Sequence, residues 1–111
     1  MSKIITSPSK HYSGSVTIAD PMTMLQVMEW EEAIEKAKAF AKEELYSAKY
    51  AREILAGIFP SIEKWELVNF PELVTIDNFP GSPKAESMKL IAWLIQEISK
   101  VYREADEIPN A

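Results

Sequence analysis

The spacing of apolar residues predicts a short β-strand near the N-terminus. Between residues 10 and 19, apolar side chains fall at even-numbered positions, namely Tyr12, Val16 and Ile18. Apolar residues with a period of two share one face of an extended strand. Gly14 interrupts the run and indicates a weak point or a bulge. Residues 1–9 are rich in serine, proline and lysine, so we expect a flexible N-terminus before the strand.

A helical period replaces this alternation over residues 21–57. Apolar side chains recur there at intervals of three and four residues, at Val27, Trp30, Ile34, Ala37, Ala41, Leu45 and Ala48. A second apolar set, which begins at Phe40, faces another direction. The pattern is compatible with one helix buried on two sides. We favour two helices that separate near residues 43–47, or one bent helix.

Residue types typical of helix ends suggest where this region starts and stops. Asp20 as N-cap with Pro21 at the first helical position is one start. Thr23 followed by Gln26 is a competing start, because the two can form a capping box. Gly57 is the expected C-terminal stop.

Proline-containing turns interrupt the chain over residues 58–82, which we interpret as a loop rich in aromatic residues. Two short stretches within it, residues 65–68 and 73–76, are strand candidates. Either stretch is a possible partner for the strand predicted at residues 10–19.

The last apolar pattern predicts a helix over residues 83–105. Ser82 is a suitable N-cap, and Pro83 fits the first helical position. The expected core face comprises Met88, Ile91, Leu94, Ile95, Ile98, Val101, Tyr102 and Ala105. We expect a flexible tail at residues 106–111. The elements together predict a single domain over residues 10–105 that is mainly α, with two or three packed helices and a minor short β element.

Composition argues against several classes of function. The chain has 111 residues and a net charge of −5, and its basic residues are interspersed with carboxylates, which disfavours nucleic-acid binding. It has no cysteine, so neither a disulfide scaffold nor a thiolate metal site is available. No signal-peptide pattern and no long apolar run occur, so we expect a cytoplasmic protein without a membrane partner.

Candidate catalytic chemistry is sparse. His11 is the only histidine, and it falls on the polar face of the predicted strand, so we interpret it as solvent-exposed. The acidic residues at the start of the helical region lie largely off the apolar stripe and lack the Glu-x-x-His motif of a di-metal bundle; they are Glu29, Glu31, Glu32 and Glu35. No nucleophile, phosphate-binding or zinc motif occurs. We therefore expect no enzyme activity, no catalytic residue, no cofactor and no metal.

Trp93 is the most informative side chain for binding. On a helical wheel of the last helix it falls nearly opposite Ile91 and Ile95, among polar residues that include Lys89 and Gln96. Trp is enriched in binding hot spots, so this surface is a candidate contact for a protein partner or for a second copy of the chain. The alternative is that the loop from Trp65 to Phe79, or the N-terminal strand, covers Trp93.

Methionines gather where the helical region begins, at Met22, Met24 and Met28. The simplest interpretation is that they pack in the core. Because Met side chains adapt to irregular surfaces, the group is also a candidate surface for an apolar partner. Together with Trp65, Trp93, Lys89 and Gln96, they make up the hypothetical partner-binding set.

Several segments of the second half combine into a family resemblance. Ile62–Leu67 places alternating residues around Trp65, residues 69–76 form a turn and a polar stretch, and Pro80–Pro83 precedes an apolar helix. This order resembles the tail assembly chaperones of long-tailed bacteriophages. The opening residues 14–23 also resemble the start of small phage and prophage proteins.

The resemblance implies a non-enzymatic role in the cytoplasm of a bacterial host. Such chaperones bind the long, helical, aggregation-prone tape-measure protein before the tail tube forms around it. Two other functions remain open. One is a structural head or tail completion subunit that stays in the phage particle, and the other is a small acidic inhibitor or adaptor of a host protein.

Overall fold

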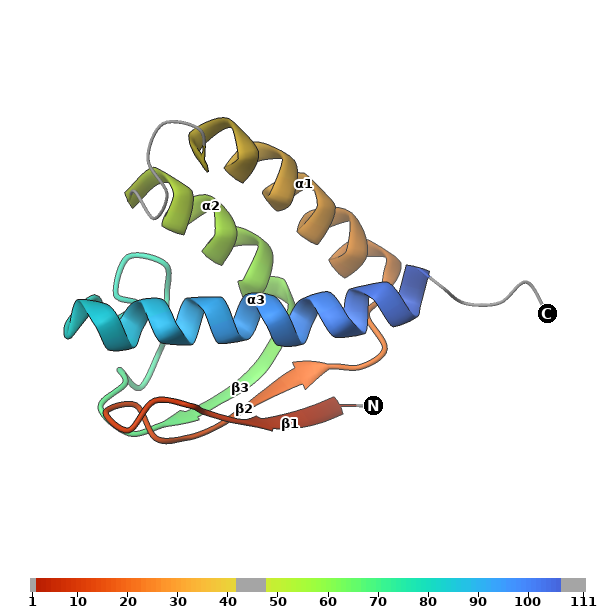
Figure 1. The fold of residues 1–111 in the computed structure, drawn as a ribbon. Coiled ribbons are helices and arrows are strands. Elements are labelled where there is room, and N and C mark those ends of the chain that lie inside the picture. Colours follow the sequence, from red (N-terminus) through yellow and green to blue (C-terminus); the bar gives the residue numbers. More distant parts are fainter. Residues whose placement is uncertain (1, 42–47, 107–111) are drawn as a thin grey trace.

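The computed structural model describes residues 2–41 and 48–106, which form an α+β fold (Figure 1). The described elements are, in order, β1 (Ser2–Thr6), β2 (Gly14–Ala19), α1 (Met24–Ala41), α2 (Ala48–Ile58), the short 3-10 helix η1 (Phe59–Ser61), β3 (Ile62–Leu67) and α3 (Lys84–Asp106). The prediction of a mainly α fold with a minor β element is therefore wrong. The described residues include an antiparallel three-stranded sheet, which forms one layer of the fold.

The sheet has the order β1-β2-β3, with both pairs antiparallel. Val16 pairs with Ile5 on one side and Trp65 on the other. Ile5 and Val16 are buried, whereas Ile4, on the opposite face of β1, is 70% exposed. One face of the sheet is therefore covered and the other is open to solvent.

Long-range pairing explains where the strand predictions were wrong. We expected residues 1–9 to be flexible, but Ser2–Thr6 pairs with β2 and buries Ile5. The strand expected at residues 10–19 is shorter, because His11 and Tyr12 lie in a turn and β2 begins at Gly14. Of the two later candidates, the first overlaps β3, while residues 73–76 form no strand.

α1 and α2 form a hairpin of helices that run in opposite directions (Figure 1). Gly57 lies inside α2 rather than stopping the helix, and a Cβ built there would lie 2.4 Å from the Cβ of Ala33. The small residues therefore allow the two helices to approach closely. The predicted break at residues 43–47 lies outside the described residues.

α3 supplies the centre of the core. Among its described residues, the apolar side chains that are fully or almost fully buried are Leu90, Leu94, Ile98 and Val101. The buried face is centred on these residues, so the face predicted from the sequence was rotated too far and omitted Leu90. The helix begins at Lys84, one residue later than expected, and the Ser87 amide donates to the Pro83 carbonyl at 3.0 Å. Asp106 ends the helix, and the rest of the predicted tail lies outside the described residues.

Candidate protein-binding surface

The first two turns of α1 expose a cluster of large apolar side chains. Met24 is 80% exposed, Leu25 is 64% exposed and Met28 is 57% exposed. We call these residues the α1 patch. The other exposed large apolar residues in the described part of the chain are Ile4, Val68 and Leu73. Only the α1 patch places several such residues within one turn and a half of a helix, so it is the strongest candidate contact surface.

Helical geometry places the patch opposite the buried face of α1. At about 100° per residue, the three patch residues fall within an arc of roughly 100°. The buried residues Trp30, Ala33 and Ala37 lie on the other side of the helix, where they face the rest of the domain. Outward orientation of the patch therefore follows from the same rotation that buries Trp30.

A capping box holds the beginning of α1 in place. The Thr23 amide donates to Gln26 Oε1 at 2.8 Å, and the Gln26 amide donates to Thr23 Oγ1 at 3.2 Å. Of the two predicted starts, the capping box is confirmed, and the start with Asp20 as cap is wrong. Gln26 Nε2 also donates to the Pro60 carbonyl at 3.0 Å, which ties this turn to η1. The patch is thus presented on a fixed turn.

Charged residues follow the patch along the exposed side of α1. Lys36 Nζ lies 3.0 Å from Glu32 Oε1, and both side chains are largely exposed. The hydrogen bond to Glu32, helped by its negative charge, raises the pKa of Lys36 above its ordinary value of 10.5. The exposed side of α1 is therefore apolar at the α1 patch and charged at Glu32 and Lys36.

The structure divides the methionines that the sequence grouped together. Met24 and Met28 are exposed and lie side by side on α1, as a partner surface requires. Met22 is only 7% exposed and belongs to the core, so it was wrongly included in the set. Leu25 was missed, although the helical wheel that separates it from Trp30 is visible in the sequence.

Trp93 is neither fully exposed nor fully covered. It is half-buried and packs against the core cluster, at the flank of the buried face of α3. Its position follows from the rotation of that face toward Leu90, which places Trp93 beside the core rather than opposite it. The structure does not bring Trp93 together with the exposed methionines, which lie on α1.

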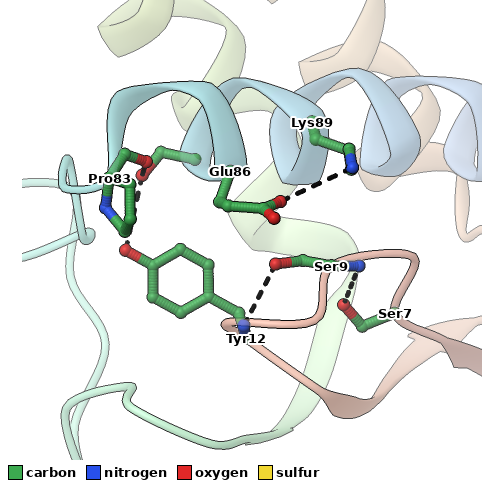
Figure 2. Close-up of polar contacts among 7 residues, drawn as sticks. Ser7, Ser9, Tyr12, Pro83, Glu86 and Lys89 are labelled. Atoms are coloured by element: carbon green, nitrogen blue, oxygen red, sulfur yellow. Dashed lines mark hydrogen bonds and ion pairs between the residues drawn. The ribbon is translucent and has the colours of Figure 1, made fainter.

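The polar residues proposed near Trp93 are exposed on α3. Lys89 Nζ lies 3.6 Å from Glu86 Oε2, and Figure 2 shows this pair on α3. Gln96 is also exposed. Lys89 and Gln96 border a half-buried indole, so they lack the open aromatic surface that the sequence suggested.

Trp65 belongs to an aromatic cluster on the inner side of β3. Its ring centroid lies 5.5 Å from Phe59, 5.5 Å from Phe70 and 6.1 Å from Phe79. Phe70 and Phe79 come from the loop after β3, so their rings attach that loop to the domain. Trp65 is half-buried by these contacts and packs against the core, so it does not present an open aromatic surface.

The described residues hold no group of three or more His, Cys, Asp or Glu side chains suited to a metal ion. None of the helices in residues 2–41 and 48–106 combines the length and the hydropathy of a membrane span. Comparison with protein-family models, curated proteins and solved structures finds no significant match to this chain. The case for a function therefore depends on the surfaces of the domain and on the resemblance described above.

Proposed function

We propose that this chain is a tail assembly chaperone of a long-tailed phage or prophage, acting without catalysis in the cytoplasm of the bacterial host. Its partner in this proposal is the helical tape-measure protein. The single observation that supports binding most strongly is the α1 patch, a set of large apolar side chains held outside the core by a rigid helix start. The phage assignment itself rests on the sequence resemblance.

The chemistry of the patch suits an apolar helical partner. Met side chains adjust their shape to different apolar surfaces, which a chaperone needs when it covers successive stripes of a long helix. The net charge of −5 helps to keep the complex in solution while those stripes are covered.

The size of the patch suits reversible binding. Complete burial of three such side chains contributes on the order of 5–9 kcal/mol. Loss of translational and rotational freedom on association opposes this by about 4–15 kcal/mol. The patch alone therefore supports a weak complex, as expected for a chaperone that tail-tube subunits later displace.

Co-expression tests the proposal. The tagged chain is co-expressed with the tail genes of the phage or prophage that encodes it, and the captured proteins are identified by mass spectrometry. We expect one long protein in soluble form, with a helical circular-dichroism spectrum. A variant with Met24→Gln, Leu25→Gln and Met28→Gln should recover at least tenfold less of it.

A matched variant controls for the general loss of exposed apolar surface. It carries Ile4→Thr, Val68→Thr and Leu73→Gln, which remove the other exposed large apolar side chains of the described residues. This variant should retain the partner. Recovery of a host protein instead, or persistence of the chain in purified phage particles, would favour the inhibitor or the completion subunit and contradict the chaperone proposal.

A further inference from the structure

A second concave surface lies between α2, the loop after β3 and the start of α3. It has a volume of about 270 Å³, and its apolar lining includes Leu55, Ile76, Phe79, Met88 and Ile91. We call it the α2–α3 groove. Figure 1 shows that the start of α3 and the start of α1 lie at opposite ends of the molecule, so the groove and the α1 patch are separate surfaces.

The floor and walls of the groove differ in exposure. Leu55 is only 3% exposed and closes the floor. Ile76, Phe79, Met88 and Ile91 are half-buried, so part of each apolar side chain remains open to an incoming group. The groove therefore offers apolar contact area without any rearrangement of the core.

Two cationic side chains line this apolar groove. Arg52 comes from α2 and Lys84 from the first turn of α3. Arg52 Nη2 lies 2.9 Å from Asp77 Oδ1, whereas Lys84 forms no ion pair with any described residue. The dipole of α3 adds partial positive charge at the same end. Because Asp77 offsets the charge of Arg52, the positive rim of the groove is the charge of Lys84, in a chain whose net charge is −5.

We propose that the α2–α3 groove binds an acidic amphipathic segment of a protein partner. A large apolar side chain of that segment fills the groove, and a neighbouring carboxylate lies against Lys84. Charge complementarity selects this occupant, because a basic segment would bring like charges to the rim. The proposal goes beyond the chaperone assignment, since it concerns another surface and holds for any partner with this chemistry.

The volume of the groove agrees with a side chain as its occupant. Pockets for cofactors and other small molecules usually measure about 300–1,000 Å³. At about 270 Å³, the groove lies just below that range. A groove of this size accommodates one or two side chains of a partner.

Binding of two synthetic peptides to the purified full chain tests the proposal. One peptide is an amphipathic helix whose leucine stripe is flanked by glutamates, and the other carries lysines in place of those glutamates. Fluorescence anisotropy should show binding of the glutamate peptide and roughly tenfold weaker binding of the lysine peptide. High salt should reduce the difference, because exposed charges are screened.

Variants of the groove locate the binding site. A Cβ added at Gly81 would meet no atom within 4 Å, so Gly81→Trp can obstruct the groove without a backbone clash, and Gly81→Ser is the matched control. Lys84→Glu reverses the rim charge at a helix start where a carboxylate is favourable. Lys64→Glu is its matched control, because it makes the same charge change at an exposed position of β3. Gly81→Trp and Lys84→Glu should each lower the affinity for the glutamate peptide at least fivefold. Gly81→Ser and Lys64→Glu should leave that affinity unchanged.

Several results would overturn the proposal. Equal affinity for the two peptides would show that the positive rim does not select an acidic segment. Unchanged binding in Gly81→Trp, with a native circular-dichroism spectrum, would place the peptide elsewhere. Sedimentation that shows a dimer of the chain, abolished by Gly81→Trp, would make a second copy the occupant in place of an acidic partner. Because the peptide assay uses no phage protein, a failure of the chaperone proposal leaves its outcome unaffected.

Discussion

The helices α1 and α3 use their large apolar side chains in opposite ways. On α3, Leu90 and Leu94 are fully buried beside the sheet and the helical hairpin. On the first turns of α1, Met24 and Leu25 are mostly exposed. Both helices carry apolar residues at helical spacing in the sequence. On α3 the described large apolar side chains are buried or half-buried, whereas α1 leaves three of them exposed.

The difference follows from the kind of contact that each helix makes. α1 approaches α2 through small residues, with Ala33 against Gly57, and Trp30 is its one large buried side chain among residues 24–39, whose burial the structure describes. Such a contact needs no further large residues from the start of the helix. The α1 patch is therefore not required to form the core, and its side chains are available to a partner.

The largest expected effect is on α3. Leu94→Ala removes a fully buried side chain from the core and should lower the free energy of unfolding by about 2–5 kcal/mol. Urea denaturation followed by circular dichroism measures the change. The control is Leu25→Ala at an exposed position of α1, which should change the free energy of unfolding by no more than about 0.5 kcal/mol. Equal losses from the two substitutions would contradict the contrast between the helices.

A smaller effect is expected where α1 meets α2. Gly57→Ala places a methyl group 2.4 Å from the Cβ of Ala33, so the helices must move apart. Such overpacking costs about 1–3 kcal/mol. Thermal unfolding of Gly57→Ala measures the loss, and Ala56→Ser, at an exposed position of the same turn, serves as the control. A stabilised Gly57→Ala variant would mean that the close approach is not a constraint.

The α1 patch should affect binding far more than stability. The variant with Met24→Gln, Leu25→Gln and Met28→Gln should keep its free energy of unfolding within about 1.5 kcal/mol of the parent, because exposed substitutions usually change it by about 0.5 kcal/mol each. Chemical denaturation checks this alongside partner recovery. A larger loss would show that the patch supports the fold.

The smallest expected effect concerns the charged continuation of the patch. In the folded chain the pKa of Lys36 is raised, so the Glu32–Lys36 pair stabilises the fold below the ordinary pKa of 10.5, and this contribution disappears as the pH rises through the raised value. Glu32→Gln should return the pKa of Lys36 toward 10.5. NMR titration of the lysine side chain measures the shift, and an unchanged pKa would exclude Glu32 as its cause.

Local sequence signals predicted much of the helical structure. The capping box of Thr23 and Gln26 marks the true start of α1, because it depends on residues only three positions apart. The apolar period identified α3 nearly to its ends. In contrast, β1 depends on pairing with β2 and carries few apolar residues, so its sequence alone resembled a mobile terminus.

The candidate surfaces were only partly predictable, because they too depend on contacts between distant segments of the chain. The sequence grouped Met22 with Met24 and Met28, but burial separates them, since Met22 precedes the helix and reaches the core. The α2–α3 groove brings Leu55, Phe79 and Ile91 together from distant segments, and no local pattern indicates that proximity.

The helical segments, the cap of α1, the net negative charge, the single histidine and the lack of cysteine can all be read from the amino-acid sequence. These features depend on residue type and on spacings of a few residues, which local chemistry controls. Three features become visible only in the folded chain: β1 joins the sheet, Trp93 is half-buried, and Met24, Leu25 and Met28 stay exposed. Burial depends on which distant segments cover a side chain, so it follows from the packing of the whole chain.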